Sequence, residues 1–229
     1  MKKIRNQIQN VSNFQEIISS DFHGNVNAFC WNRELIGDFS EIVQKLEPKE
    51  NIVEIDLDEL YYLQLSENGN LAREILLKDI KLLTDHGASP VLNIINSYDR
   101  DDSLLFFPTD VYSFHVDHSP IPTSTFLCTY HGEPSEILPN AEGTQKILIP
   151  EIREELRKIH NGNEEDFEEF LTDHFFDLHY QAQTNADIIN LGKGNLWRIA
   201  VDHPESKALP YLHRAPYEKD GESRLLLIC

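Results

Sequence analysis

From Pro90 onward, the sequence is a succession of short β-branched and aromatic runs separated by Gly, Pro, Asn and Asp. Such runs are typical of strands. Strand-like and helical segments do not alternate regularly, so the pattern does not indicate a βαβ fold. The runs are PVLNIINS, VYSFHV, TSTFLCTY, QKILIP, DIINLG, LWRIAV, PYLHRA and RLLLIC. They predict a small β-barrel or sandwich in the second part of the chain.

The first part of the chain is mainly helical in pattern, after an extended piece, VNAFCW. Asp38 or Ser40 can cap a helix through FSEIVQKL, which Pro48 ends. A second helical segment is expected in LDELYYLQL. A third, NLAREILLKDIKLLTDHG, has Asn70 at its cap and Gly87 just beyond its end. These helices are expected to support the β core.

An acidic helical segment interrupts the strands from about Glu151 to Tyr180. We interpret it as an insertion lying over the β-structure. At 229 residues, the chain is long enough to bury one good-sized core. We therefore expect an α+β single domain over 1–229, in which 1–89 is mainly helical support and 90–229 carries the β core.

The net charge limits the classes of partner, and the cysteine pattern indicates the cellular compartment. A formal net charge of −19 argues against a nucleic acid or an anionic membrane surface as the main partner, and favours a small-molecule or cationic substrate over a polyanion. The start has no apolar segment typical of a secretory signal, and no run is long enough to span a bilayer. Cys30, Cys128 and Cys229 show no C-x-x-C spacing, which suggests reduced thiols and a cytoplasmic protein.

The stretch YSFHVDHSP ends a strand-like run with potential metal ligands. Side chains alternate along a strand, so His115 and Asp117 project to one face while Val116 points away. A second histidine from elsewhere would complete the set of two histidines and one carboxylate that is typical of non-haem Fe(II) oxygenases. An H-x-D by itself also occurs at ordinary polar strand ends, so this interpretation needs a further ligand.

The C-terminal stretch PYLHRAPYEKDGESRLLLIC offers that ligand. His213 precedes Arg224 by eleven positions, and turn-like residues between them predict a hairpin centred near Glu218 and Lys219. A regular pairing would place His213 opposite Arg224, with their Cβ atoms about 5 Å apart. Pro216 means that this ladder is not wholly regular.

Arg224 is an unusual residue to open the apolar strand LLLIC. A guanidinium facing a barrel interior needs an anionic partner, because burying an unpaired charge is costly. A bound carboxylate would be such a partner, held by both arms of the planar guanidinium. The alternative is an arginine at the strand entry that reaches solvent or pairs with an acidic residue.

Taken together, H-x-D, a distant histidine and a following arginine resemble the Fe(II)- and 2-oxoglutarate-dependent oxygenases over roughly residues 90–229. The resemblance implies a double-stranded β-helix, a jelly-roll or cupin-like barrel. It implies that His115, Asp117 and His213 form the catalytic metal site and hold Fe(II), while Arg224 binds the co-substrate 2-oxoglutarate. The implied reaction is hydroxylation of a small-molecule or amino-acid-like substrate.

A second resemblance covers more of the chain. The stretches VNAFCWNREL, FHVDHSP, FLCTYHGEPSEILP, LHRAP and RLLLIC are similar to a bacterial family known as a domain of unknown function. This resemblance implies no activity, but it suggests that the N-terminal helices and the barrel form one unit.

Several alternative assignments remain open. His203 is also followed by an arginine eleven residues later, Arg214, although His203 lies in a turn-rich stretch. His118 could replace His115 as a ligand, but a role beside the ligands suits it better. Tyr130 could hydrogen-bond a 2-oxoglutarate carboxylate or simply pack. The sequence assigns no role to His131, and the histidines of the acidic insertion, His160, His174 and His179, are interpreted as surface or filler positions.

The same three ligands also suit other functions. One alternative is a cupin-like protein that binds zinc or another divalent metal without catalysis. Another is a metal-dependent oxygenase that does not use 2-oxoglutarate. The sequence has no G-x-S-x-G, Walker A, H-E-x-x-H or strand-linked G-x-G-x-x-G motif for a competing chemistry.

Overall fold

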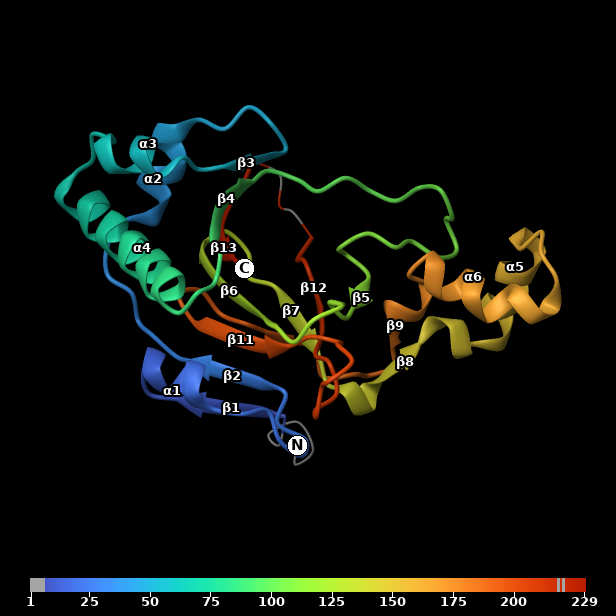
Figure 1. The fold of residues 1–229 in the computed structure, drawn as a ribbon. Helices are drawn as coiled ribbons and strands as arrows, with labels where there is room; N and C mark the ends of the chain where they lie inside the picture. Colours follow the sequence, from blue (N-terminus) through green and yellow to red (C-terminus); the bar gives the residue numbers. More distant parts are fainter. Residues whose placement is uncertain (1–6, 218, 220) are drawn as a thin grey trace.

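The computed structural model describes residues 7–217, 219 and 221–229, which form a mixed α+β fold with two β-sheets (Figure 1). The strands of the larger sheet are β1 (Ile8–Val11), β2 (Ala28–Trp31), β3 (Ile52–Glu54), β4 (Val91–Ile95), β6 (Ser124–His131), β11 (Leu196–Ala200) and β13 (Arg224–Ile228). Those of the smaller sheet are β5 (Phe114–His115), β7 (Glu136–Leu138), β8 (Gly143–Gln145), β9 (His179–Ala182), β10 (Ile189–Asn190) and β12 (Leu212–Arg214). Their spatial orders are β1-β2-β11-β6-β13-β4-β3 and β10-β7-β12-β5-β9-β8.

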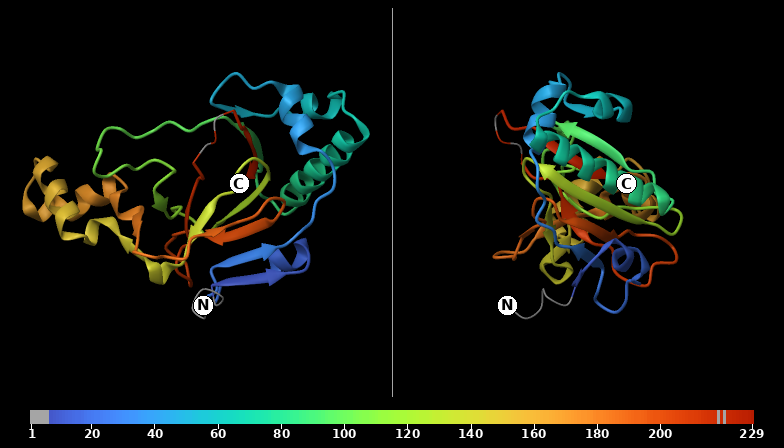
Figure 2. Two further views of the ribbon diagram at one scale, coloured as in Figure 1. Left: turned by 180° about the vertical axis from the view of Figure 1, so that it is seen from behind. Right: turned by 90° about the vertical axis from the view of Figure 1, so that its left-hand side faces the viewer.

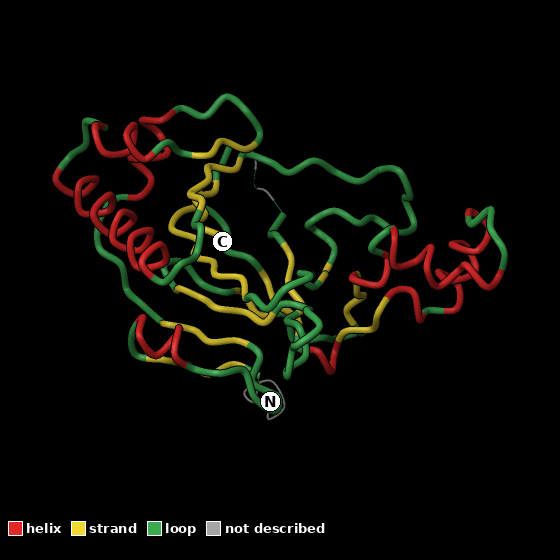
Figure 3. The backbone as a smooth tube through the Cα atoms, in the orientation of Figure 1, coloured by secondary structure: helices red, strands yellow, loops and turns green. Residues whose placement is uncertain are grey.

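The α-helices gather at two opposite ends of the molecule, with the strands between them (Figure 3). The helices at one end are α1 (Phe14–Ser19), α2 (Phe39–Leu46), α3 (Leu57–Tyr62) and α4 (Glu67–Asp85). The insertion at the other end contains α5 (Pro150–Ile159) and α6 (Phe167–Asp173). Short 3-10 helices occur at Asn140–Glu142, Lys146–Leu148, Glu164–Asp166 and Phe176–Leu178. No helix of the described ranges is both long and apolar enough to cross a membrane.

Strand β13, in the interior of the larger sheet, explains how the layers pack. Leu225 and Leu227 are buried in a cluster with helix residues, among them Leu76 of α4. Leu226 points the other way and packs in a second cluster with Tyr211, between the two sheets. Both faces of the strand are thus covered, by helices on one side and by the smaller sheet on the other (Figure 2). This explains why RLLLIC reads as an unbroken apolar run and not as an alternating one.

The helix boundaries follow local capping chemistry. Asp38 caps α2 by accepting hydrogen bonds from the backbone N–H groups of Ser40 and Glu41, as predicted for that helix. The predicted cap of α4 is wrong, because the helix begins at Glu67 and Ser66 caps it through the N–H of Gly69. The serine hydroxyl provides the acceptor four residues before Asn70.

One further prediction needs correction. The run QKILIP is not a strand: β8 ends at Gln145 and a 3-10 turn follows, because Pro150 opens α5 and Ile147 is buried in the core of the insertion. The segment 1–89 contributes strands as well as its helices. Its strands β1, β2 and β3 belong to the larger sheet and form both of its edges.

The predicted pairing of His213 with Arg224 is wrong. β12 belongs to the smaller sheet and β13 to the larger one, so the chain between them crosses from sheet to sheet. Pro216 in this crossing cannot donate to a ladder. Of the predicted turn centre, Glu218 lies outside the described residues. Both strands nevertheless face the space between the sheets, and His213 and Arg224 line one cavity.

Candidate metal centre

Two histidines from opposite ends of the β region lie side by side on the smaller sheet. His115 of β5 is directly opposite His213 of β12 in an antiparallel pair, and their ring centroids are 4.6 Å apart. Residues directly opposite each other in such a pair project to the same face. Both imidazoles therefore point into the space between the sheets.

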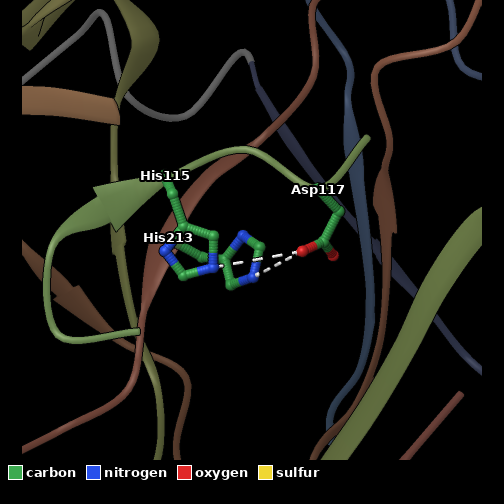
Figure 4. A group of neighbouring side chains, drawn as sticks. All are labelled: His115, Asp117 and His213. Atoms are coloured by element: carbon green, nitrogen blue, oxygen red, sulfur yellow. Dashed lines mark ion pairs between the residues drawn. The ribbon is translucent and has the colours of Figure 1, made fainter. Parts of the chain in front are cut away.

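Asp117 completes the group (Figure 4). It follows His115 by two residues, and its Oδ1 lies 4.0 Å from Nε2 of His115 and 3.5 Å from Nε2 of His213. One ligand atom from each residue lies within 4.8 Å of the others. Of the parts of the chain that the structure describes, this is the one group of three or more His, Cys, Asp or Glu residues close enough to share a metal ion.

Backbone carbonyls orient both imidazoles. Nδ1 of His115 lies 2.8 Å from the carbonyl oxygen of Ser113, and Nδ1 of His213 lies 3.3 Å from that of Tyr211. A carbonyl oxygen can only accept, so each Nδ1 carries the hydrogen and donates it. In the neutral imidazole with Nδ1 protonated, which is the tautomer that metal ligation requires, the Nε2 lone pair lies on the side of Asp117.

A threonine orients the carboxylate. Thr125 of β6 donates a hydrogen bond of 2.5 Å from Oγ1 to Oδ2 of Asp117, which leaves Oδ1 facing the histidines. Burial raises the pKa of Asp117, but His213 and the Thr125 hydrogen bond outweigh it and hold that pKa below its usual value. Asp117 is therefore a carboxylate at neutral pH.

The charge state of His115 also suits a metal ligand. Burial, assisted by the neighbouring His213, lowers the pKa of His115 to about 4. The imidazole is therefore neutral near pH 7, when its Nε2 lone pair is available for coordination.

Arg224 has no ion-pair partner within the described ranges. Only 6% of the residue is exposed; Nη2 donates to Thr129 Oγ1 (3.1 Å) and to Ser135 Oγ (2.6 Å), and Nη1 lies 3.4 Å from the Tyr98 hydroxyl. Its buried Nε has no hydrogen-bond partner among the described residues. Burial lowers the pKa of Arg224, yet a guanidinium stays charged in proteins.

Arg33, whose side chain is 9% exposed, offers a comparison. Arg33 forms an ion pair of 2.7 Å with the buried Asp79. Among the described residues, the guanidinium of Arg33 is thus paired with a carboxylate, whereas that of Arg224 is hydrogen-bonded to hydroxyl groups alone. The positive charge of Arg224 is accordingly not compensated by any carboxylate of the described residues.

One cavity of about 290 Å³ joins the metal-ligand group to Arg224. Its wall includes Thr125, which contacts Asp117, and Ser135, which contacts Arg224. The rest of the wall is largely apolar and comes from Ile52, Asn93, Ile95, Tyr98, Val111, Leu127, Ala215, Leu226 and Ile228. A small ligand in this cavity can reach the candidate metal position and the guanidinium together.

Tyr130, the predicted contact for 2-oxoglutarate, lies elsewhere. Its side chain belongs to the cluster under the helices, and its hydroxyl donates a 2.6 Å hydrogen bond to Asp79. Tyr130 is three residues past Leu127, an odd number, so the alternation of β6 turns it to the opposite face from the cavity. Tyr130 therefore packs in the core under the helices, as the alternative interpretation predicted, and it does not reach the cavity.

The other alternative residues are also outside the cavity. His118 is exposed, and its Nδ1 lies 3.0 Å from Oδ2 of Asp202. Arg214 forms an ion pair with Glu136 at 2.7 Å, so the alternative register of His203 and Arg214 does not lead into the cavity. His131 lines a separate surface hollow beside Ser40 and Gly221.

His179 is a neighbour of the site that the sequence did not identify. It is buried on β9, directly opposite His115, with ring centroids 5.9 Å apart. Burial, with help from His115, lowers its pKa to about 3, and its Nδ1 has no hydrogen-bond partner in the described part of the chain. The sequence predicted a helical stretch at this position, whereas His179 begins strand β9. No local sequence pattern reveals its pairing with His115.

Comparisons with protein-family models, curated proteins and solved structures find no match to this chain. The resemblances drawn from short motifs therefore stay predictions. The chemical argument rests on the donor set itself, two imidazole nitrogens and one carboxylate oxygen. This set suits Fe(II) with open coordination positions, and it also suits zinc.

Proposed function

We propose that the chain is an Fe(II)- and 2-oxoglutarate-dependent oxygenase that hydroxylates a small-molecule or amino-acid-like substrate. The observation that carries the proposal is Arg224, a buried guanidinium with no carboxylate partner in the described ranges, in the same cavity as His115, Asp117 and His213. Bound iron would supply the activation of dioxygen that is coupled to oxidative decarboxylation of 2-oxoglutarate to succinate.

The fold is compatible with this proposal. Successive strands alternate between the sheets along much of the β region: β4, β6, β11 and β13 belong to the larger sheet, while β5, β7 and β12 belong to the smaller one. This alternation, with helices behind the larger sheet, supports a double-stranded β-helix of the jelly-roll or cupin-like kind. The candidate ligands then come from the smaller sheet and the anion-binding arginine from the larger one.

The residues of the cavity would have three separate roles: holding the metal, binding the co-substrate and excluding water. His115, Asp117 and His213 would hold the metal, with the carbonyls and Thr125 keeping their donor atoms oriented. Arg224 would bind the distal carboxylate of 2-oxoglutarate, and Ser135 and Thr129 would hold the guanidinium in place. The apolar wall would exclude water from the reacting groups.

Anaerobic addition of Fe(II) and 2-oxoglutarate tests the proposal. We expect a visible metal-to-ligand charge-transfer band, and at least a tenfold weaker 2-oxoglutarate affinity in Arg224→Met, because the charged partner of the carboxylate is removed. Arg214→Met is the matched control, since Arg214 pairs with Glu136 outside the cavity. A wild-type protein that binds Fe(II) without producing the band contradicts the proposal.

A non-enzymatic, cupin-like zinc protein is the second candidate. It is favoured by the hydroxyl groups of Thr129, Ser135 and Tyr98, which already surround Arg224 without a co-substrate. This candidate predicts tight zinc binding that depends on His115 and His213. It also predicts that 2-oxoglutarate has no measurable affinity for the metal-loaded protein.

A further inference from the structure

The charges in the cavity constrain what else can bind there. Histidines bound to a metal are neutral imidazoles, so with the metal in place Asp117 and Arg224 are the charged side chains among the described residues that line the cavity. Under the proposed function, Fe(II) brings two positive charges and 2-oxoglutarate two negative ones, so the loaded cavity carries no net charge. A charged substrate would enter a largely apolar space without a counter-charge, which is costly.

Asn93 is the polar group that this arrangement leaves free. Its side chain lines the cavity, and its amide has no hydrogen-bond partner in the part of the chain that the structure describes. An asparagine amide both donates and accepts. It therefore complements a group with the same capacity, of which a carboxamide is the simplest.

The strand register separates Asn93 from the anion anchor. On β4, Ile95 lies opposite Arg224 and Asn93 lies opposite Leu226. Asn93 is therefore one same-face step, about 7 Å, along the strand from the level of Arg224. A ligand held by Asn93 can thus lie beside a carboxylate held by Arg224.

The neighbouring edge strand forms the opening. Ile52 of β3 lines the cavity and is 44% exposed, so this side of the cavity reaches solvent. Glu54 is exposed on the same strand, opposite Asn93, where its charge disfavours an approaching anion. The wall inside the opening is aliphatic and includes Val111, Ala215 and Ile228.

We propose that the prime substrate is a small uncharged molecule with a branched aliphatic group, whose carboxamide or similar polar group is bound by Asn93. This inference rests on the proposed function, because the charges of iron and 2-oxoglutarate enter the argument. Asn93 is the specificity-determining residue, and Ile52 forms the rim of the entrance.

Three probes with similar branched carbon skeletons test this assignment: 4-methylpentanamide, 4-methylpentanoate and 3-methylbutylamine. Each is titrated anaerobically into protein loaded with Fe(II) and 2-oxoglutarate, and binding is followed through the change in the charge-transfer band. We expect the neutral amide to bind at least tenfold more tightly than the anion or the cation. Equal binding, preference for a charged probe, or binding of none of the probes overturns the assignment.

Variants of Asn93 test the residue itself. We expect Asn93→Leu to weaken binding of 4-methylpentanamide about tenfold while the 2-oxoglutarate titration is unchanged. Asn93→Asp should reverse the preference toward 3-methylbutylamine, and Asn161→Leu, at an exposed position in the insertion, should change neither. An unchanged probe preference in both Asn93 variants overturns the role of Asn93. If wild-type protein with Fe(II) and 2-oxoglutarate shows no charge-transfer band, the proposed function is overturned as well. If the band forms but the probe preference does not depend on Asn93, only the substrate assignment is overturned.

Discussion

His115 and His213 lie directly opposite each other on neighbouring antiparallel strands, with their ring centroids 4.6 Å apart. Each ring donates from Nδ1 to the carbonyl oxygen of the residue two positions earlier. The two imidazoles are therefore oriented before a metal binds. Pre-orientation of this kind lowers the cost of assembling a metal site.

Removal of either histidine should abolish tight metal binding. We expect His115→Ala and His213→Ala each to weaken Fe(II) or zinc affinity at least about a hundredfold, because a two-ligand site remains. His118→Ala is the matched control, since His118 is three residues from His115 but faces Asp202 at the surface. Calorimetric metal titrations check this, and intact affinity in both ligand variants contradicts the site.

Thr125 should tune the metal affinity without being a ligand. Thr125→Val keeps the shape of the side chain but removes the hydrogen bond to Oδ2 of Asp117. Loss of such a supporting contact typically weakens metal affinity 10–100-fold. Thr172→Val, which removes a hydrogen bond to a helix carbonyl in the insertion, should leave affinity unchanged. Equal affinities of the two variants in metal titrations would show that Thr125 does not orient the carboxylate.

His179 should make the protein less stable in mild acid. The pKa of His179 is about 3 in the folded protein, against an ordinary value of 6.5 for histidine, so the unfolded chain takes up the proton first as the pH falls. The stabilisation present at pH 7 is then lost progressively as the pH falls from about 6.5 toward 3. At pH 5 the loss from this one residue is about 2 kcal/mol.

Urea unfolding at pH 7 and pH 5 measures this loss. His179→Phe removes the titrating group, so its free energy of unfolding should fall by about 2 kcal/mol less than that of wild type between the two pH values. His174→Phe, at an exposed position on the same insertion, is the control. If wild type and His179→Phe lose equal stability, the buried imidazole of His179 is not the cause.

Local patterns were sufficient to predict half of the candidate site. The H-x-D spacing predicts, from strand alternation, that His115 and Asp117 face the same side, and the structure brings them together although β5 ends at His115. The caps of α2 follow from similarly local chemistry. These features depend on neighbours in the sequence, so the sequence alone could reveal them.

The remaining features depend on long-range packing. The sequence could not show that β12 and β13 belong to different sheets, because the partner of a strand is chosen by distant residues. The same holds for Tyr130, whose partner Asp79 lies fifty-one positions away, and for His179, which meets His115 only across the β5–β9 pair. Of the residues that line the cavity, the sequence identified His115, Asp117, His213 and Arg224 but not the others, because their common space forms only when the two sheets pack together.

Removing the counter-charge of Arg33 should lower the free energy of unfolding much more than removing the charge of Arg224. Asp79→Ala leaves Arg33 buried without its counter-charge and removes the acceptor of Tyr130, so the free energy of unfolding should fall by about 3–5 kcal/mol. Arg224→Met breaks no ion pair seen in the described residues and removes an unpaired buried charge. Its free energy of unfolding, measured in urea without ligand, should not fall by more than about 1 kcal/mol.

Addition of the ligand should reverse the ranking of wild type and Arg224→Met. Millimolar 2-oxoglutarate with an inert divalent metal should raise the melting temperature of wild type but not that of Arg224→Met, because a ligand stabilises only the state that binds it. Arg214→Met should behave like wild type, since its guanidinium pairs with Glu136 and lies outside the cavity. If Arg224→Met is strongly destabilised without ligand, Arg224 is a structural residue. If its stability without ligand is unchanged and 2-oxoglutarate no longer raises its melting temperature, Arg224 is the residue that binds the anion.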